Sequence, residues 1–115
     1  MKNRVLIEES FKKPARRLAK RYPSFPNDVL QLIGELETNA LLGASLGRNL
    51  RKIRLAIRSK GKGKSGGARV IAYTYLKAGR IHLLTVYDKS DRENISDEEL
   101  NRFLVELEAE QENEI

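Results

Sequence analysis

Hydrophobic residues follow a helical spacing in the first third of the chain. In residues 9–21 they recur every three or four positions, with lysines and arginines between them, as in an amphipathic helix. Pro23 and Pro26 end this helix, and a similar spacing returns over residues 27–38. These two segments predict a helical hairpin. Residues 3–7, which end in Val-Leu-Ile, predict a short strand before it.

The middle of the chain changes to the alternation and the β-branched and aromatic composition that are typical of strands. Three strands are predicted here, over residues 50–58, 68–76 and 81–87. Glycines and small residues predict a connecting loop over 39–49, and lysines, glycines and a serine predict another over 59–67. Because the links between them are short, the three strands are expected to form an antiparallel meander.

The last segment returns to helical spacing. Ser96 and Glu99 match a capping box, and the apolar residues that follow fall on one helical face. A helix is therefore predicted over about residues 96–109, followed by a frayed polar tail over 110–115. The order β-α-α-β-β-β-α predicts a single α+β domain over residues 1–115. In this domain an antiparallel sheet packs on the helical hairpin in two layers and leaves its other face open.

The first strand of the meander has two different faces, because successive side chains of a strand point to opposite sides of the sheet. One side carries the apolar residues Ile53, Leu55 and Ile57. The other side carries the basic residues Lys52, Arg54 and Arg58. The apolar side is expected in the core, so the open face of the sheet should be cationic.

Charge is strongly segregated along the chain, although the net charge is only +6. Residues 1–37 carry 8 basic and 5 acidic groups, residues 38–87 carry 11 basic groups and no acidic one, and residues 88–115 carry 3 and 11. The eleven cations within these fifty residues repel one another unless an anionic partner compensates their charge. Nucleic acid is the commonest such partner. The alternative is a solvated basic surface with no partner.

Composition excludes several kinds of site. The chain has no cysteine, which rules out disulfides, thiolate metal sites and cysteine nucleophiles, and it has one histidine, which rules out a ribonuclease with a histidine pair. No residues have metal-ligand spacing, so no metal or other cofactor is expected and a metal-dependent nuclease is disfavoured. No apolar run approaches the roughly 20 residues that span a bilayer, and a signal-peptide core is lacking. We therefore expect a cytoplasmic protein with no membrane partner.

The cations of the expected open face suit the cleavage of RNA. Attack by a ribose 2′-hydroxyl on the adjacent phosphorus needs a base, an acid and stabilisation of a doubly charged phosphorane. Arg69 offers a planar fork to phosphate, and it follows a glycine pair that lets a ligand approach the backbone. Lys52 has the like charge of Arg54 beside it, which favours the neutral amine that a base requires. The alternative for Arg69 is a structural ion pair with the acidic C-terminal helix.

The cations that follow this strand suit RNA binding better than catalysis. Arg58, Lys60, Lys62 and Lys64 are expected to contact the phosphate backbone. A flexible glycine loop does not hold a side chain with the precision that catalysis requires.

Four segments in this element order resemble the RelE/ParE superfamily of type II toxin–antitoxin toxins. They are residues 52–55 (Lys-Ile-Arg-Leu), 61–69 (Gly-Lys-Gly-Lys-Ser-Gly-Gly-Ala-Arg), 68–73 (Ala-Arg-Val-Ile-Ala-Tyr) and 83–90 (Leu-Leu-Thr-Val-Tyr-Asp-Lys-Ser). The glycine-rich segment is similar to the HigB-like branch of RelE toxins. The resemblance implies a RelE-like fold and a ribosome-dependent, metal-independent endoribonuclease. Such a toxin cuts mRNA on the ribosome and is neutralised by a cognate antitoxin protein.

The resemblance also implies roles for individual residues. Lys52 and Arg54 match the paired basic residues of the first meander strand in the family. Arg69 matches the arginine that opens the next strand, and Lys89 matches the basic residue after the last strand. Family members often add a tyrosine near the C-terminus, but residues 94–96 contain none.

Tyr87 is the best placed tyrosine to replace the missing one, because it stands beside Asp88 and Lys89 at the end of the last strand. Its alternative role is packing, which is the usual role of a tyrosine in a strand.

Two other functions stay open at this point. A toxin of the ParE type inhibits DNA gyrase by binding it and needs no catalytic cations on the sheet, so Lys52, Arg54 and Arg69 favour the nuclease. A non-catalytic RNA-binding module would require base-stacking aromatic residues on the open face, and only the strand tyrosines could supply them.

Overall fold

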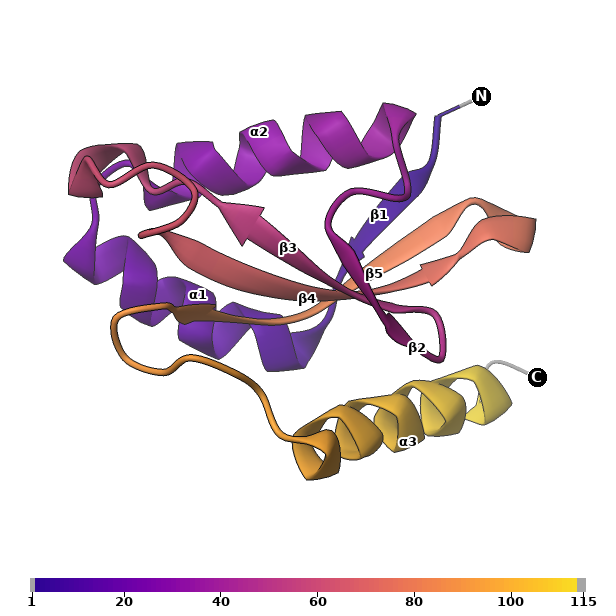
Figure 1. Cartoon of the computed structure of the whole chain (residues 1–115). Coiled ribbons are helices and arrows are strands. Elements are labelled where there is room, and N and C mark those ends of the chain that lie inside the picture. The colour runs from indigo at the N-terminus through magenta and orange to yellow at the C-terminus, as the bar shows by residue number, and fades with distance from the viewer. Residues whose placement is uncertain (1, 114–115) are drawn as a thin grey trace.

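The computed structural model describes residues 2–113 as one mixed sheet with helices on both faces (Figure 1). The elements in chain order are β1 (Arg4–Ile7), α1 (Glu9–Arg21), α2 (Phe25–Thr38), β2 (Ala44–Gly47), β3 (Leu50–Leu55), the short helix η1 (Arg58–Lys60), β4 (Ala68–Tyr75), the short helix η2 (Leu76–Ala78), β5 (Arg80–Asp88) and α3 (Asp97–Asn113). The predicted α+β class is confirmed, with several corrections to its details.

The five strands lie in the order β1-β5-β4-β3-β2. Strands β3, β4 and β5 pair antiparallel to one another, as the predicted meander requires. Strand β1, however, pairs in parallel with β5, with Arg4 opposite Arg80, so the expected purely antiparallel sheet is wrong. A parallel pair needs a long connection between its strands. The α1–α2 hairpin and the meander together provide it.

Strand β2 lies in the segment that was expected to be only a loop. It is four residues long and pairs antiparallel with β3. Arg51 of β3 supports the preceding turn, because its guanidinium donates hydrogen bonds to the carbonyls of Leu41, Leu42 and Gly43. This strand is therefore held by its neighbour and not by its own composition, which explains why alternation did not predict it.

The helical hairpin covers one face of the sheet. Helix α1 has the predicted bounds, whereas α2 begins at Phe25, two residues earlier than expected, because a proline is tolerated in the first turn of a helix. The buried residues Phe11, Phe25 and Leu36 of the hairpin form one apolar cluster with Ile53 and other strand residues. The predicted apolar side of β3 therefore packs against the hairpin.

Helix α3 covers part of the opposite face, so the prediction of an open second face is wrong. Its residues Leu100 and Leu107 pack with Leu50, Ile71 and further residues of the strands. The predicted capping box is present, because the Glu99 N–H donates to the Ser96 hydroxyl over 3.2 Å. The helix continues to Asn113, four residues beyond its predicted end, so most of the expected frayed tail is helical. Residues 114–115 of that tail lie outside the described residues.

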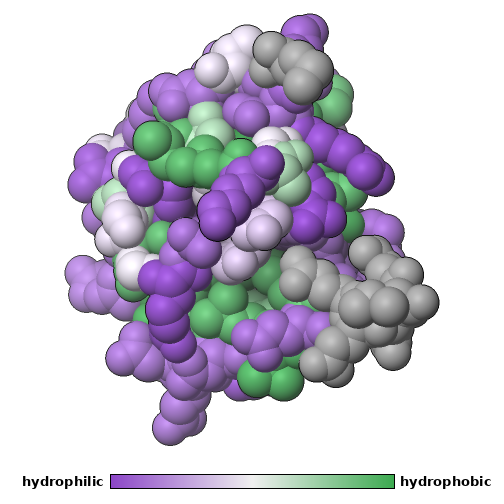
Figure 2. Space-filling view, turned by 90° about the vertical axis from the view of Figure 1, so that its right-hand side faces the viewer, coloured by the Kyte–Doolittle hydropathy of each residue, from purple (hydrophilic) through white to green (hydrophobic). Residues whose placement is uncertain are grey.

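Hydrophobic residues lie in separate patches on the face of the molecule shown in Figure 2. Figure 2 shows green hydrophobic residues between purple hydrophilic ones on the side of the molecule that faces right in Figure 1. The large exposed hydrophobic residues include Leu41, Leu76 and Val105. None of the helices within residues 2–113 has the length and apolar character needed to cross a membrane.

Candidate functional site

Three of the predicted site residues form one row across three neighbouring strands. Arg54 on β3 lies opposite Arg69 on β4, and Arg69 lies opposite Tyr87 on β5. Residues that face each other across strands project on the same side of a sheet, with Cβ atoms about 4.5–5.5 Å apart. Lys52 stands two residues from Arg54 and therefore shares this side. The structure thus brings together four of the five predicted catalytic residues beside the area that α3 covers.

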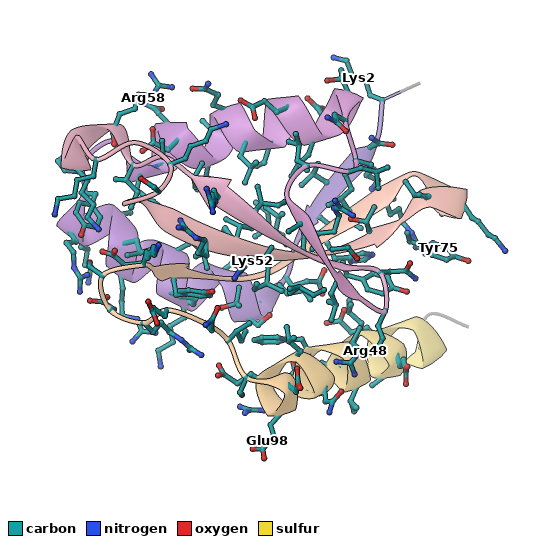
Figure 3. The ribbon with its side chains drawn as sticks, in the orientation of Figure 1. Lys2, Arg48, Lys52, Arg58, Tyr75 and Glu98 are labelled. Carbon is teal, nitrogen blue, oxygen red and sulfur yellow. The ribbon has the colours of Figure 1, made fainter. Side chains whose placement is uncertain are left out.

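Lys52 lies over the middle of the sheet and points toward the segment between β5 and α3 (Figure 3). Its Nζ donates a hydrogen bond to Asn94 Oδ1 at 3.2 Å. Lys52, Arg54 and Lys64 also line a groove of about 550 Å³ between α2 and the edge of β3, in which Glu35 is the only carboxylate among the described lining residues. Cations from β3 and from the glycine-rich loop therefore share one concave surface.

Arg69 is only 4% exposed. Its guanidinium donates to the backbone carbonyls of Lys64, Ala68 and Ser65 over 2.9, 3.0 and 3.0 Å. Burial, and then the neighbouring Arg54 guanidinium, lower the pKa of Arg69, although an arginine stays charged at neutral pH. Among the described residues it forms no ion pair with α3, so the alternative role expected for it is not present. Arg69 instead supports the loop that precedes it.

The glycine-rich loop over residues 59–67 is held at both ends by hydrogen bonds. At its start, the Ser59 N–H donates to the Ser24 hydroxyl over 2.8 Å. At its end, the Gly67 carbonyl accepts a hydrogen bond from the Lys89 N–H at 3.1 Å. Gly67 also allows close packing, since a Cβ at this position would lie 2.1 Å from the Leu55 carbonyl oxygen. The loop therefore presents its exposed Lys62 and Lys64 from a fixed base.

Two other cations predicted to bind RNA have protein partners. Arg58 lies in η1 and not on β3, and its Nε stands 3.3 Å from Asp28 Oδ1 of α2 (Figure 3). It does not share the face of Lys52, because the strand ends at Leu55. The Lys60 side chain is 10% exposed, and its Nζ lies 2.7 Å from Asp88 Oδ1. Their roles in RNA binding stay predictions.

Tyr87 is 7% exposed, and its hydroxyl has no hydrogen-bond partner among the described residues. Burial raises the pKa of Tyr87, so the hydroxyl keeps its proton at neutral pH. The Arg92 guanidinium lies 5.1 Å from the centre of its ring and pairs with Glu99 at 2.6 Å. Lys89, two residues further on, is exposed. The Tyr87 hydroxyl is thus a free, protonated donor under a surface ion pair.

The sequence analysis missed three residues around this site: Asp88, Arg92 and Asn94. One signal could have found Asp88, because it is the first carboxylate after the fifty residues that have none. Arg92 and Asn94 had no such signal, since their contacts with Tyr87 and Lys52 depend on the path of the chain between β5 and α3. Within residues 2–113, no group of three or more possible metal ligands is present.

Residues 3–111 match the family described as the RelE toxin of the RelE / RelB toxin-antitoxin system. Solved structures with a similar fold include the RelBE2 toxin–antitoxin complex from Mycobacterium tuberculosis, with a TM-score of 0.58 and 16% identity over 79% of this chain and 95% of that one. A mutant of E. coli toxin RelE in the free state gives a TM-score of 0.58 and 14% identity over 81% and 90%. The archaeal RelE–RelB complex from Pyrococcus horikoshii gives 0.53 and 20% over 80% and 100%. Together with the match over nearly its whole length, this fold shows that the chain belongs to the RelE toxin family.

Proposed function

We propose that this chain is the toxin of a toxin–antitoxin pair and that it inhibits translation by cutting mRNA on the ribosome as a metal-independent endoribonuclease. The observation that supports this most is the position of Arg54 directly opposite Arg69. Like charges directly opposite each other destabilise a sheet. A phosphate group bound at Arg54 would relieve this repulsion.

The reaction begins with attack of the ribose 2′-hydroxyl on the adjacent phosphorus, which breaks the bond to the 5′-oxygen of the next nucleotide. It leaves a 2′,3′-cyclic phosphate and a 5′-hydroxyl. Negative charge on the phosphoryl oxygens increases in the transition state, and fixed cations at that point lower the barrier. Arg54 would contact the phosphate, and the buried Arg69 would add its positive charge from behind while its guanidinium holds the loop carbonyls.

Lys52 and Tyr87 would handle the protons. Lys52 is partly exposed and can reach a bound ribose as the base. The Tyr87 hydroxyl is protonated and has no partner among the described residues, so it would donate to the departing 5′-oxygen once RNA displaces the Arg92–Glu99 ion pair that covers it. Lys89 would add positive charge at the rim, and Lys62 and Lys64 would hold the RNA backbone.

A cognate antitoxin protein would control this activity in the cytoplasm, where mRNA and ribosomes are found. Two of the similar structures are complexes of a RelE toxin with its antitoxin. An antitoxin segment that covers the Lys52, Arg54 and Arg69 face would need acidic side chains, because complementary charge sets the association rate and the specificity of such contacts.

Primer extension on ribosome-bound mRNA tests the proposal. The purified chain should create breaks in the mRNA only when ribosomes are present, with 5′-hydroxyl ends that polynucleotide kinase can label. Arg54→Ala should lower the cleavage rate by about 10²–10³, the cost of removing one charge stabiliser. Lys77→Ala is the matched control, since Lys77 is an exposed cation in η2 at the opposite end of the β4–β5 pair, and it should cleave normally.

Two results would contradict the proposal. RNA binding without cleavage would indicate a non-catalytic RNA-binding module. Intact mRNA together with inhibition of DNA supercoiling by gyrase would indicate a toxin of the ParE type.

A further inference from the structure

Asp88 is a buried carboxylate at the junction of three parts of the chain. Its side chain has no exposed surface, and both oxygens are saturated with donors. Oδ1 accepts hydrogen bonds from Lys60 Nζ at 2.7 Å and from the N–H and hydroxyl of Ser90 at 2.9 and 2.7 Å. Oδ2 accepts from the Tyr22 hydroxyl at 2.5 Å and from Arg21 at 3.1 Å.

These donors connect the two parts of the proposed RNA site. Lys60 opens the loop that carries Lys62 and Lys64. Asp88 itself lies between Tyr87 and Lys89, at the end of the row of site residues. Arg21 and Tyr22 belong to the end of α1, which packs on β5 from the hairpin side.

The loop needs such a contact more than an ordinary loop does. Glycine loses more conformational freedom on ordering than any other residue, and Gly61 and Gly63 both adopt positive φ angles, of 73° and 63°. The lysines of the loop also repel one another. Within residues 2–113, Asp88 is the only carboxylate that pairs with a lysine of this loop.

We propose that Asp88 is a positioning residue that holds the glycine-rich loop against the end of β5, so that the RNA site is formed before RNA binds. Asp88 does not touch the RNA in this arrangement. The proposal rests on the proposed function for its effect on cleavage, but not for its effect on the loop. A loop that is correctly placed only part of the time weakens RNA binding by that fraction and leaves the rate at saturation unchanged.

Hydrogen exchange of the full chain tests the effect on the loop without any RNA. Asp88→Asn keeps the shape of the side chain and removes its charge, and Lys60→Met removes the other partner. Both variants should make the amides of residues 59–67 exchange about fivefold faster or more, with the amides of β4 unchanged. The double variant should match the single variants, because both remove the same contact.

Asp91→Asn is the matched control. Asp91 also pairs with Arg21, at 2.9 Å, but it is half-exposed and does not contact the loop. The hydrogen exchange of residues 59–67 and the RNA affinity of the Asp91→Asn variant should equal those of the unaltered chain.

Single-turnover cleavage tests the effect on the site. Asp88→Asn and Lys60→Met should raise the RNA concentration for half-maximal rate by about tenfold and keep the maximal rate within about threefold. If Asp88→Asn fails to fold, Lys60→Met alone decides the question, because Asp88 keeps its hydrogen bonds from Arg21, Tyr22 and Ser90 in that variant.

Unchanged exchange in the loop, or equally faster exchange in β4, would overturn the proposal, because Asp88 would then have no role or only a general role in stability. A loss of maximal rate with unchanged RNA affinity would overturn it as well. If the unaltered chain cleaves no RNA, the proposed function fails, and the exchange comparison decides the role of Asp88 by itself.

Discussion

Helices cover both faces of the sheet, but the two faces differ in what they bury. The α1–α2 hairpin closes its face mainly with apolar residues, and the buried carboxylates on that side, Asp28 and Asp88, are paired with cations. On the other face, α3 covers only the apolar area around Leu50, and beside it lie Lys52, Arg54 and Arg69. Charged groups lose hydration on burial, so Lys52 and Arg54 favour water or an anionic ligand over an apolar cover. The difference separates a face that provides stability from one that leaves charge available for a ligand.

The largest expected effect is on the hairpin face. Phe25→Ala removes a side chain that is 1% exposed and should lower the free energy of unfolding by about 3–5 kcal/mol. Phe103→Ala on α3 removes a half-buried ring and should cost about 1–2 kcal/mol. Urea unfolding measures both values. Equal costs would mean that α3 contributes as much to the core as the hairpin does.

Tyr87→Phe should separate activity from stability on the second face. The hydroxyl is buried without a partner among the described residues, so its removal should not lower the free energy of unfolding. The loss of a proton donor should reduce the cleavage rate by about 10² or more. Thermal unfolding and single-turnover cleavage provide the two measurements. A fully active Tyr87→Phe would exclude this hydroxyl from the reaction.

Acid should weaken the contacts that Asp88 makes with the glycine-rich loop and with the end of α1. Burial alone would raise the pKa of Asp88, but hydrogen bonds from Lys60, Tyr22 and Ser90 outweigh it and hold the pKa well below 3.8. A carboxyl with a lowered pKa in the folded state contributes stability above its unfolded value, and this contribution is lost as the pH falls below it. Urea unfolding between about pH 4 and pH 2 should therefore show a steeper loss for the unaltered chain than for Asp88→Asn. An equal loss of unfolding free energy with falling pH in the two proteins would contradict this.

The smallest expected effect is on RNA binding by the loop. Replacing Lys62 and Lys64 by glutamine should weaken RNA binding at low salt and make the slope of log affinity against log salt shallower by about 2. Anisotropy of a labelled RNA over a salt series measures this slope. Lys77→Gln serves as the control and should leave this slope unchanged. If Lys77→Gln changed the slope as much per lysine as the loop substitutions do, the loop would have no special role in RNA binding.

The sequence predicted best those features that depend on neighbouring residues in the chain. The bounds of α1 and the cap of α3 were correct, because a helix and its first turn are decided locally. The shared face of Lys52 and Arg54 also followed from alternation alone.

Features that depend on contacts between distant segments were not predicted. Strand β2 exists because β3 pairs with it. The carbonyls that Arg69 binds, and the pairing of Lys60 with Asp88, are decided by how the loop folds back on the sheet. Charge counts along the chain predicted that cations would gather, but they did not show which of these cations would be neutralised inside the protein.

The parallel pairing of β1 with β5 determines when this protein can fold during its synthesis. Strand β1 is made before all the other strands of the sheet, but within residues 2–113 its only partner strand is the last of them, with Arg4 paired to Arg80. Pairing between segments so far apart in sequence is slow and comes late in folding. The nascent chain therefore lacks a complete sheet until β5 has been made, and the row that ends at Tyr87 is assembled only then.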